Sequence, residues 1–348
     1  LGGIGVMLGY AYFLDGDFAT AVSVLEETIK TGVVAGAINS TMGAYCVLAR
    51  LFALQGRLHR CWELYEEAEP MVDDGRVEIG LARVALARED HDAVIKHARR
   101  AIKRDRENSG YHLTLAYGYG LKAARGGMSA VFYAGKFKGA CEEAVKFDPE
   151  NVEAHFAVLQ YYLMAPGLMG GGEEKAQETI STIESLDPFY GHLARALEAW
   201  VDEDADRAED EYMAAALVDS ASPEGWVVLG MFYMEERRYA DGIPVWSRAL
   251  SLDPDDLEVV YALSKTRLLA GTELDAAAEG FRRYIEEGAG PRGATEAEAR
   301  WRLGMTLDRA GMPLEAHAQW ERALELDPEL ERAAALIESI EKVYPELE

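Results

Sequence analysis

The stretch WVVLGMFYMEERRYADGIPVWSRALSLDP, residues 226–254, decides the fold. Apolar residues recur at helical spacing on both sides of the polar segment 235–238, a pattern that predicts two helices joined by a short turn. Small residues stand where the two helices would touch and large ones beside them: Gly230, Gly242 and Ala249 are small, whereas Trp226, Leu229, Tyr233 and Trp246 are large. The stretch is therefore predicted to be a helical hairpin closed by Leu252-Asp253-Pro254.

The same pattern returns 74 positions later, as Leu303, Gly304, Leu307, Ala316, Trp320, Ala323 and Leu326-Asp327-Pro328. That distance equals two 34-residue units and an insertion of six residues. A 34-residue helix–turn–helix with the spacing W-x2-L-G-x2-Y is typical of tetratricopeptide repeats, and this stretch resembles that family. The resemblance implies an all-α, right-handed α-solenoid of about nine helical hairpins with a C-terminal capping helix.

The resemblance extends along the whole chain, which we expect to form a single solenoid over residues 1–348. The expected repeats are residues 1–40, 41–74, 75–108, 109–150, 151–188, 189–221, 222–255, 256–295 and 296–329, with the cap at 330–348. The first two units match at an offset of 40, which places the extra residues in a linker near 31–40. Gly16 and Gly56 are expected at hairpin turns, where glycine accepts a positive φ without strain.

Two central units are longer than 34 residues. In unit 109–150 the second helix is expected to be extended and to start near Met128. Unit 151–188 carries the turn Ala165-Pro-Gly-Leu-Met-Gly-Gly-Gly172, and the two units resemble a bacterial tetratricopeptide subgroup with an Ala-Pro-Gly…Gly-Gly insertion. The turn could present backbone N–H groups to an anion. No lysine or arginine is expected beside it and Glu173-Glu174 follow, so a phosphate site is not expected.

The chain is strongly acidic, with 61 Asp and Glu against 35 Lys and Arg, a net charge of −26 and a pI near 4.7. Such a chain repels phosphate backbones, so we expect neither nucleic-acid binding nor attraction to an anionic membrane. No apolar run approaches the ~18 residues of a membrane span. One basic island interrupts the acidity: Lys96, Arg99, Arg100, Lys103, Arg104 and Arg106. It is either a solvated face that pairs with acidic neighbours or an anchor for an acidic peptide or a second copy of the chain.

Motifs for catalysis and metal binding are missing from the sequence. Residues 202–206 open like a calcium loop, but Arg207 replaces the turn glycine and Met213 the bidentate glutamate. Cys46, Cys61 and Cys141 fall at positions that helical packing buries, which favours core thiols over disulfides or a zinc site. We therefore expect no enzyme activity, catalytic residue, metal or cofactor. The sequence starts with Leu1, so a removed signal peptide is conceivable, and both cytoplasm and periplasm stay open.

The concave groove is the expected binding surface, because in this family the first helix of each hairpin lines it. Carrying the family's groove positions across gives an apolar, aromatic and methionine-rich set: Tyr10, Phe13, Tyr117, Tyr161, Met164, Met231, Met234, Tyr261, Leu268, Trp301 and Met305. The clamp that holds acidic chaperone tails in some relatives needs lysine and asparagine instead. Lys265 stands alone here, so that mechanism is disfavoured.

Three functions follow as hypotheses. The first is a protein-interaction scaffold that binds a protein or peptide partner in the apolar groove, since methionines adapt to a partner and aromatics supply contact area. The second is a structural subunit of a larger assembly or homo-oligomer, joined through its outer face and ends. The third is a carrier for an apolar small ligand. Alternatively, the groove side chains simply pack against neighbouring helices of this chain.

Overall fold

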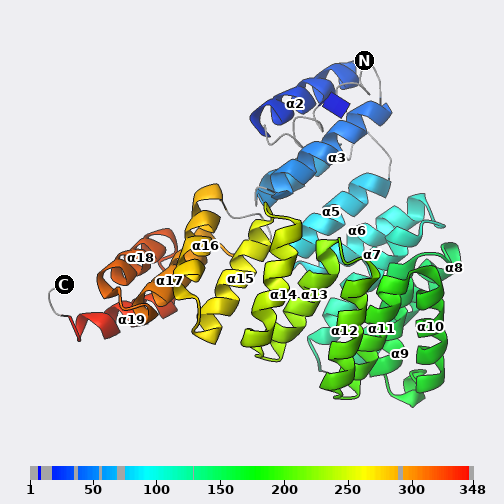
Figure 1. Ribbon diagram of the computed structural model, residues 1–348. Coiled ribbons are helices and arrows are strands. Elements are labelled where there is room, and N and C mark those ends of the chain that lie inside the picture. Colours follow the sequence, from blue (N-terminus) through cyan, green and yellow to red (C-terminus); the bar gives the residue numbers. More distant parts are fainter. Residues whose placement is uncertain are drawn as a thin grey trace. The chain divides into compact units, whose positions relative to one another are not determined.

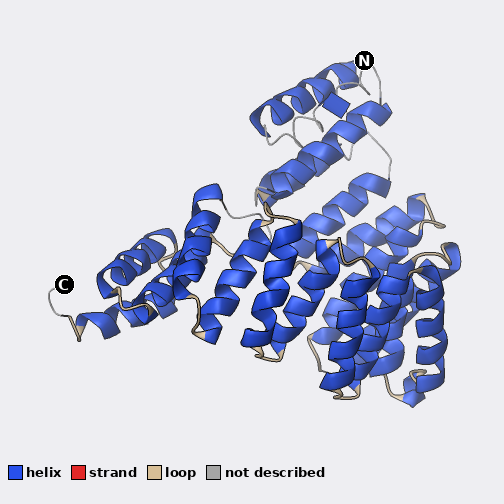
Figure 2. Cartoon of the chain, in the orientation of Figure 1, coloured by secondary structure: helices blue, strands red, loops and turns tan. Residues whose placement is uncertain are grey.

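The computed structural model describes residues 7–8, 18–34, 38–54, 57–68, 75–127, 129–288 and 293–344. Within these residues the ordered elements are α-helices and one short 3-10 helix, with no strand, which confirms the all-α prediction (Figure 2). The helices are α2 (Phe18–Val34), α3 (Ile38–Leu54), α4 (Leu58–Ala68), α5 (Gly75–Ala87), α6 (His91–Arg104), α7 (Ser109–Ala124), α8 (Ala130–Phe147), α9 (Val152–Met164), η1 (Gly167–Met169), α10 (Glu173–Leu186), α11 (Pro188–Val201), α12 (Ala205–Val218), α13 (Pro223–Glu235), α14 (Tyr239–Leu252), α15 (Leu257–Ala270), α16 (Leu274–Glu287), α17 (Glu296–Arg309), α18 (Pro313–Leu326) and α19 (Glu331–Glu341).

The chain forms two compact units, residues 1–187 and 188–348. Within each unit every described helix packs against the next one along the chain, as Figure 1 shows. Antiparallel neighbours such as α7 with α8 and α17 with α18 form the hairpins. This nearest-neighbour packing is the property that defines a helical repeat array.

The hairpin turns reproduce the expected period. Glu203, Arg237 and Gly271 follow one another at intervals of 34 residues, with φ of 58°, 57° and 71°. The N–H after each one bonds back across the turn, as in Asp204 N–H to the carbonyl of Ala199 at 2.9 Å, and so closes the end of the preceding helix. The next such turn is at Gly311, 40 residues on, which places the six-residue insertion between residues 271 and 311. Gly16 and Gly56 lie outside the described residues.

Small residues lie under large ones where hairpin helices cross, as the sequence predicts. A β-carbon on Gly230 would lie 2.6 Å from the indole of Trp246, and one on Gly304 would lie 2.3 Å from Nε1 of Trp320. Trp320 is fully buried, and its Nε1 donates to the carbonyl of Trp301 at 3.1 Å. Glycine therefore permits the close helix contact that the indole fills.

Two insertions differ from expectation in where their residues go. Much of the expected linker at 31–40 is helix, because α2 runs to Val34 and α3 starts at Ile38. In unit 109–150 the turn between the helices stays short, and the additional residues lengthen α7 and α8 to 16 and 18 residues. The expected extended helix starts at Ala130, close to the predicted position.

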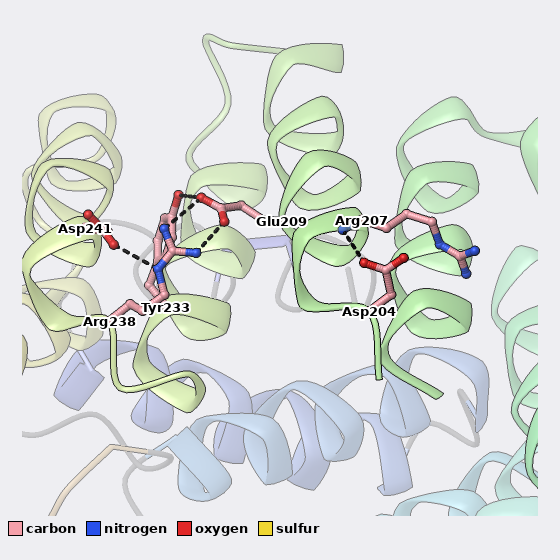
Figure 3. Close-up of polar contacts among 6 residues, drawn as sticks. All are labelled: Asp204, Arg207, Glu209, Tyr233, Arg238 and Asp241. Atoms are coloured by element: carbon pink, nitrogen blue, oxygen red, sulfur yellow. Dashed lines mark hydrogen bonds and ion pairs between the residues drawn. The ribbon is translucent and has the colours of Figure 1, made fainter. Parts of the chain in front are cut away.

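Successive hairpins in residues 188–348 solve the start of their second helix differently (Figure 3). Asp204 accepts the N–H of Arg207 at 3.1 Å and so caps α12. Arg238, 34 residues later, cannot cap; its guanidinium instead binds Glu209 and, at 2.8 Å, Asp241. The Arg238 bond and a second one from Tyr233 Oη, at 2.6 Å, lower the pKa of Glu209.

The array ends in a cap, as expected. Ala333 and Ile340 of α19 are buried in the core that α17 and α18 share, whereas Glu331, Arg332 and Glu338 are exposed. The helix thus covers the apolar face of the last hairpin with a polar outer surface.

Candidate functional site

An apolar groove of about 940 Å³ lies in residues 1–187, between α7, α8 and α9. Each helix contributes one face at helical spacing. The lining residues are Tyr117, Gly120, Leu121, Ala123 and Ala124 of α7; Ala130, Val131, Ala134 and Phe137 of α8; Glu153, Gln160, Tyr161 and Met164 of α9; Ala165, Pro166 and Met169 of the following turn; and Leu86 of α5. We call this site the α7–α9 groove. Its volume falls within the range of about 300–1,000 Å³ that is usual for ligand pockets.

Small side chains explain why the groove is open. Six of its lining positions are glycine or alanine, spread over α7, α8 and the turn after α9. In the hairpin of α13 and α14 a tryptophan, Trp246, fills the space beside a glycine. No large residue takes that part on the α7–α9 face, where Ala130 and Ala134 face Gly120 and Ala124 across the groove. The lengthened α8 thus adds a wall without filling the space.

Three of the predicted groove residues come together at this site. Tyr117, Tyr161 and Met164 all line the α7–α9 groove. Met164 is 68% exposed, whereas Tyr161 is 6% exposed and its hydroxyl donates to the carbonyl of Met169 at 2.7 Å. Tyr117 Oη donates to Glu153 Oε1 at 2.6 Å. Tyr161 therefore forms a fixed wall, and Met164 is the accessible apolar contact.

The other predicted residues lie elsewhere. Met231, Met234, Tyr261, Trp301 and Met305 belong to residues 188–348; Met231 is 54% exposed, and the other four pack partly buried against core clusters. Leu268 is 2% exposed inside the core, so it does not offer a contact to a ligand. Tyr10 and Phe13 lie outside the described residues.

Around Tyr261 the lone-lysine expectation is corrected. The ring of Tyr261 lies 4.8 Å from that of Tyr284, and the guanidinium of Arg302 lies over both Tyr261 and Trp301, at 5.4 and 4.9 Å from the ring centres. Burial and then Arg302 lower the pKa of Lys265. Lys265 on α15 is thus accompanied by an arginine from α17, a pairing that sequence spacing does not reveal.

The sequence analysis missed the contribution of α8 to the groove, because it considered only the first helix of each hairpin. Ala130, Val131, Ala134 and Phe137 carry a signal, since they recur at spacing i, i+1, i+4 and i+7. Val131 is 61% exposed, an unusual exposure for a residue on such a stripe.

The glycine-rich turn also differs from expectation, because two lysines stand beside it. Lys175 Nζ donates to the carbonyl of Gly170 at 3.3 Å. Lys138, which is 32 residues earlier in the sequence, reaches the same glycine from α8: a β-carbon on Gly170 would lie 3.1 Å from its Nζ. The expectation that no basic residue accompanies this turn was wrong.

The basic island on α6 is used in part inside the chain. Glu78 of α5 is completely buried, and it meets His97 Nδ1 at 2.6 Å and Arg104 Nη1 at 2.8 Å. Arg99 donates to the hydroxyl of Tyr119 at 2.6 Å. Buried charges require such partners, so part of the island stabilises the packing of α5, α6 and α7.

The thiols and acidic clusters give no catalytic centre. Burial raises the pKa of Cys61 to about 11 and that of Cys141 to about 12, which leaves little thiolate at neutral pH. Cys46 is half-buried, less than expected, and all three cysteines are free. Across the described ranges no cluster of three His, Cys, Asp or Glu side chains could hold a metal ion, and Asp202 pairs with Arg207 at 3.0 Å. None of the described helices is both long and apolar enough to cross a membrane.

Comparison with known proteins gives distant structural matches only. No family model and no curated protein matches the sequence. The Pseudomonas aeruginosa protein PilF is 14% identical, with 65% of this chain and 95% of that one covered at a TM-score of 0.42. TTC0263, a tetratricopeptide protein of Thermus thermophilus, gives 16%, 64%, 96% and 0.41, and the human IFIT1 dimer with m7Gppp-AAAA gives 14%, 98%, 80% and 0.48.

These scores lie below 0.5, so no argument about function rests on the matches. The assignment of the fold rests on the chain itself: helical hairpins, turns at 34-residue intervals, glycine–tryptophan contacts between hairpin helices and a polar cap. The chain has the fold of a tetratricopeptide repeat array.

Proposed function

We propose that this chain is a non-catalytic interaction scaffold that holds an apolar segment of a partner protein in the α7–α9 groove. The observation that supports this most is the groove itself, a site of about 940 Å³ with an almost wholly apolar lining and accessible residues at its edge. Val131 and Met164 are each more than 60% exposed there. Exposed apolar side chains around a concavity are typical of a binding surface.

The groove's chemistry favours binding over catalysis. Glu153 is the one carboxylate among its lining residues, and it already accepts a hydrogen bond from Tyr117. An acid–base mechanism needs a second titrating group within reach of the substrate, and the lining offers none besides tyrosines. Apolar walls with a few fixed polar groups suit the side chains of a helix or an extended peptide.

A small apolar ligand is the second candidate, because the same volume and lining would accommodate one. The two candidates differ in what touches the edge of the groove. A peptide longer than the groove would contact exposed edge residues such as Met164, whereas a small ligand would contact mainly the floor, formed by residues such as Ala134 and Phe137.

Site-specific photo-crosslinking tests the proposal. A photoreactive amino acid replaces Met164 in one variant and Met231, the matched exposed methionine of residues 188–348, in another. A protein crosslinked in native extract from position 164 and not from 231 is then purified, and its affinity is measured for wild type and Met164→Asp. Loss of affinity in Met164→Asp supports the groove. Crosslinking mainly from position 231, or unchanged affinity, contradicts it.

A further inference from the structure

The α7–α9 groove has a positively charged end. Its residue Met169 immediately precedes Gly170, where the side chains of Lys138 and Lys175 converge. A β-carbon on Gly170 would lie 3.1 Å from Nζ of Lys138 and 3.9 Å from Nζ of Lys175. Both ammonium groups also face the ring of Tyr162, at 5.8 and 5.5 Å from its centre. Two cations from separate helices thus meet at one end of an apolar surface.

The charge is unusual for this chain. Residues 108–141, which supply α7 and the first part of α8, contain Lys122, Arg125, Lys136 and Lys138 and no acidic residue, in a protein of net charge −26. The present partners of the two lysines are modest: Lys138 meets Glu142 at 3.4 Å, and Lys175 meets a backbone carbonyl at 3.3 Å. A carboxylate from outside would give a stronger, charge-assisted interaction with both.

The remaining polar group of the groove sets a direction. Glu153 lies on the first turn of α9, whereas Met169 follows that helix's last turn, so the negative and positive groups sit at opposite ends of α9. An anionic group would be repelled by Glu153 and attracted by Lys138 and Lys175. Charge complementarity therefore favours one placement of an acidic residue along the groove.

We propose that the partner segment is an apolar peptide with a carboxylate, from an Asp, a Glu or its own C-terminus, which binds Lys138 and Lys175 at the Met169 end of the groove. This rests on the proposed function. The apolar side chains supply the buried area, and the carboxylate fixes the direction of the segment and its selectivity.

Selection from a random library of twelve-residue peptides tests this without knowledge of the natural partner. Wild-type protein is the bait, and the affinity of each enriched peptide is measured for wild type, for Lys138→Glu/Lys175→Glu, for Met164→Asp and for Lys146→Glu. Lys146 is the matched control, because it lies on α8, is 63% exposed and pairs with Glu143 away from the groove. Helical content and the unfolding midpoint are compared for all four proteins.

The expected peptides combine apolar residues with an Asp, a Glu or a free C-terminus. Their affinity should fall at least tenfold with Lys138→Glu/Lys175→Glu and with Met164→Asp, stay unchanged with Lys146→Glu, and decrease at high salt. Apolar peptides that need Met164 but show no acidic preference would overturn this proposal and leave the proposed function standing. Failure to enrich any peptide sensitive to Met164→Asp would count against both.

Discussion

The two units place similar candidate residues in different surroundings. Tyr117, Tyr161 and Met164 of residues 1–187 border a groove that small residues leave open. In residues 188–348, Tyr261 and Trp301 lie against core clusters and under the guanidinium of Arg302. The same residue types at corresponding repeat positions thus form an open surface in one unit and a filled one in the other.

The difference comes from the neighbouring helix and not from the candidate residues. The α13–α14 and α17–α18 hairpins seat a tryptophan over a glycine, whereas α8 presents alanines to the groove. On its other side, α8 carries Gly135 and Gly139, and a β-carbon on either would meet nothing within 4 Å. A repeat array therefore creates a binding site where packing residues are small, and a stable hairpin where they are large.

The largest expected effect concerns binding. Met164→Asp should weaken the partner by about 2 kcal/mol or more, the size of a hot-spot loss, because it places a charge on the accessible apolar edge of the groove. Met231→Asp, at a similarly exposed methionine, should change affinity by less than about 0.5 kcal/mol. Calorimetric titration of the crosslinked partner measures both. Equal losses would remove the distinction between the units.

The next effect concerns stability and the packed side of the comparison. Gly304→Ala should lower the free energy of unfolding of residues 188–348 by about 1–3 kcal/mol, because its methyl group would lie 2.3 Å from the buried indole nitrogen of Trp320. Gly135→Ala, with open space around it, should instead raise stability by about 0.5–1 kcal/mol. Urea denaturation checks both signs. A stabilising Gly304→Ala would mean that the indole is not held in place.

A smaller effect is expected at the hairpin turns. Glu203 occupies the left-handed region at φ 58°, where a side chain is disfavoured by about 1 kcal/mol. Glu203→Gly should therefore stabilise the protein by up to that amount. Glu279→Gly, at an exposed position inside α16, should destabilise it by about 0.5–1 kcal/mol. Thermal unfolding that moves in the same direction for both variants would argue against strain at the turn.

The smallest effect is a pH dependence in residues 188–348. The bonds from Arg238 and Tyr233 lower the pKa of Glu209 in the folded state. Its contribution is present above the unfolded value of about 4.3 and is lost as pH falls through the lower folded value. Glu209→Gln should remove under about 1 kcal/mol at pH 7, since both charged groups are partly exposed, and should flatten the loss of stability below pH ~5. Parallel pH profiles for the two proteins would contradict this.

Sequence periodicity was sufficient for the fold. The match of residues 226–254 with the stretch 74 positions later located the hairpins, and Gly230 and Gly304 lie against the indoles of Trp246 and Trp320 as expected. Turn positions followed too, because Glu203, Arg237 and Gly271 keep the 34-residue interval. These features depend on contacts between neighbouring segments, which a repeat pattern records directly.

The site was predictable only in part. Tyr117, Tyr161 and Met164 followed from the repeat pattern, but the open volume depends on Ala130 and Ala134 of a helix whose extra length the pattern does not place. The meeting of Lys138 with Lys175 arises across 37 residues, from the path of the turn after α9. Such convergence is a property of the folded geometry and has no local sequence signal.

Hydrogen exchange of the chain with and without its partner tests the central claim most directly. The account predicts added protection of backbone amides in α7, in the first half of α8 and from α9 to the start of α10, because these segments border the groove and its charged end. Amides of α13, α15 and α17 should exchange unchanged. Protection confined to residues 188–348 would contradict the claim that the α7–α9 groove is the binding site.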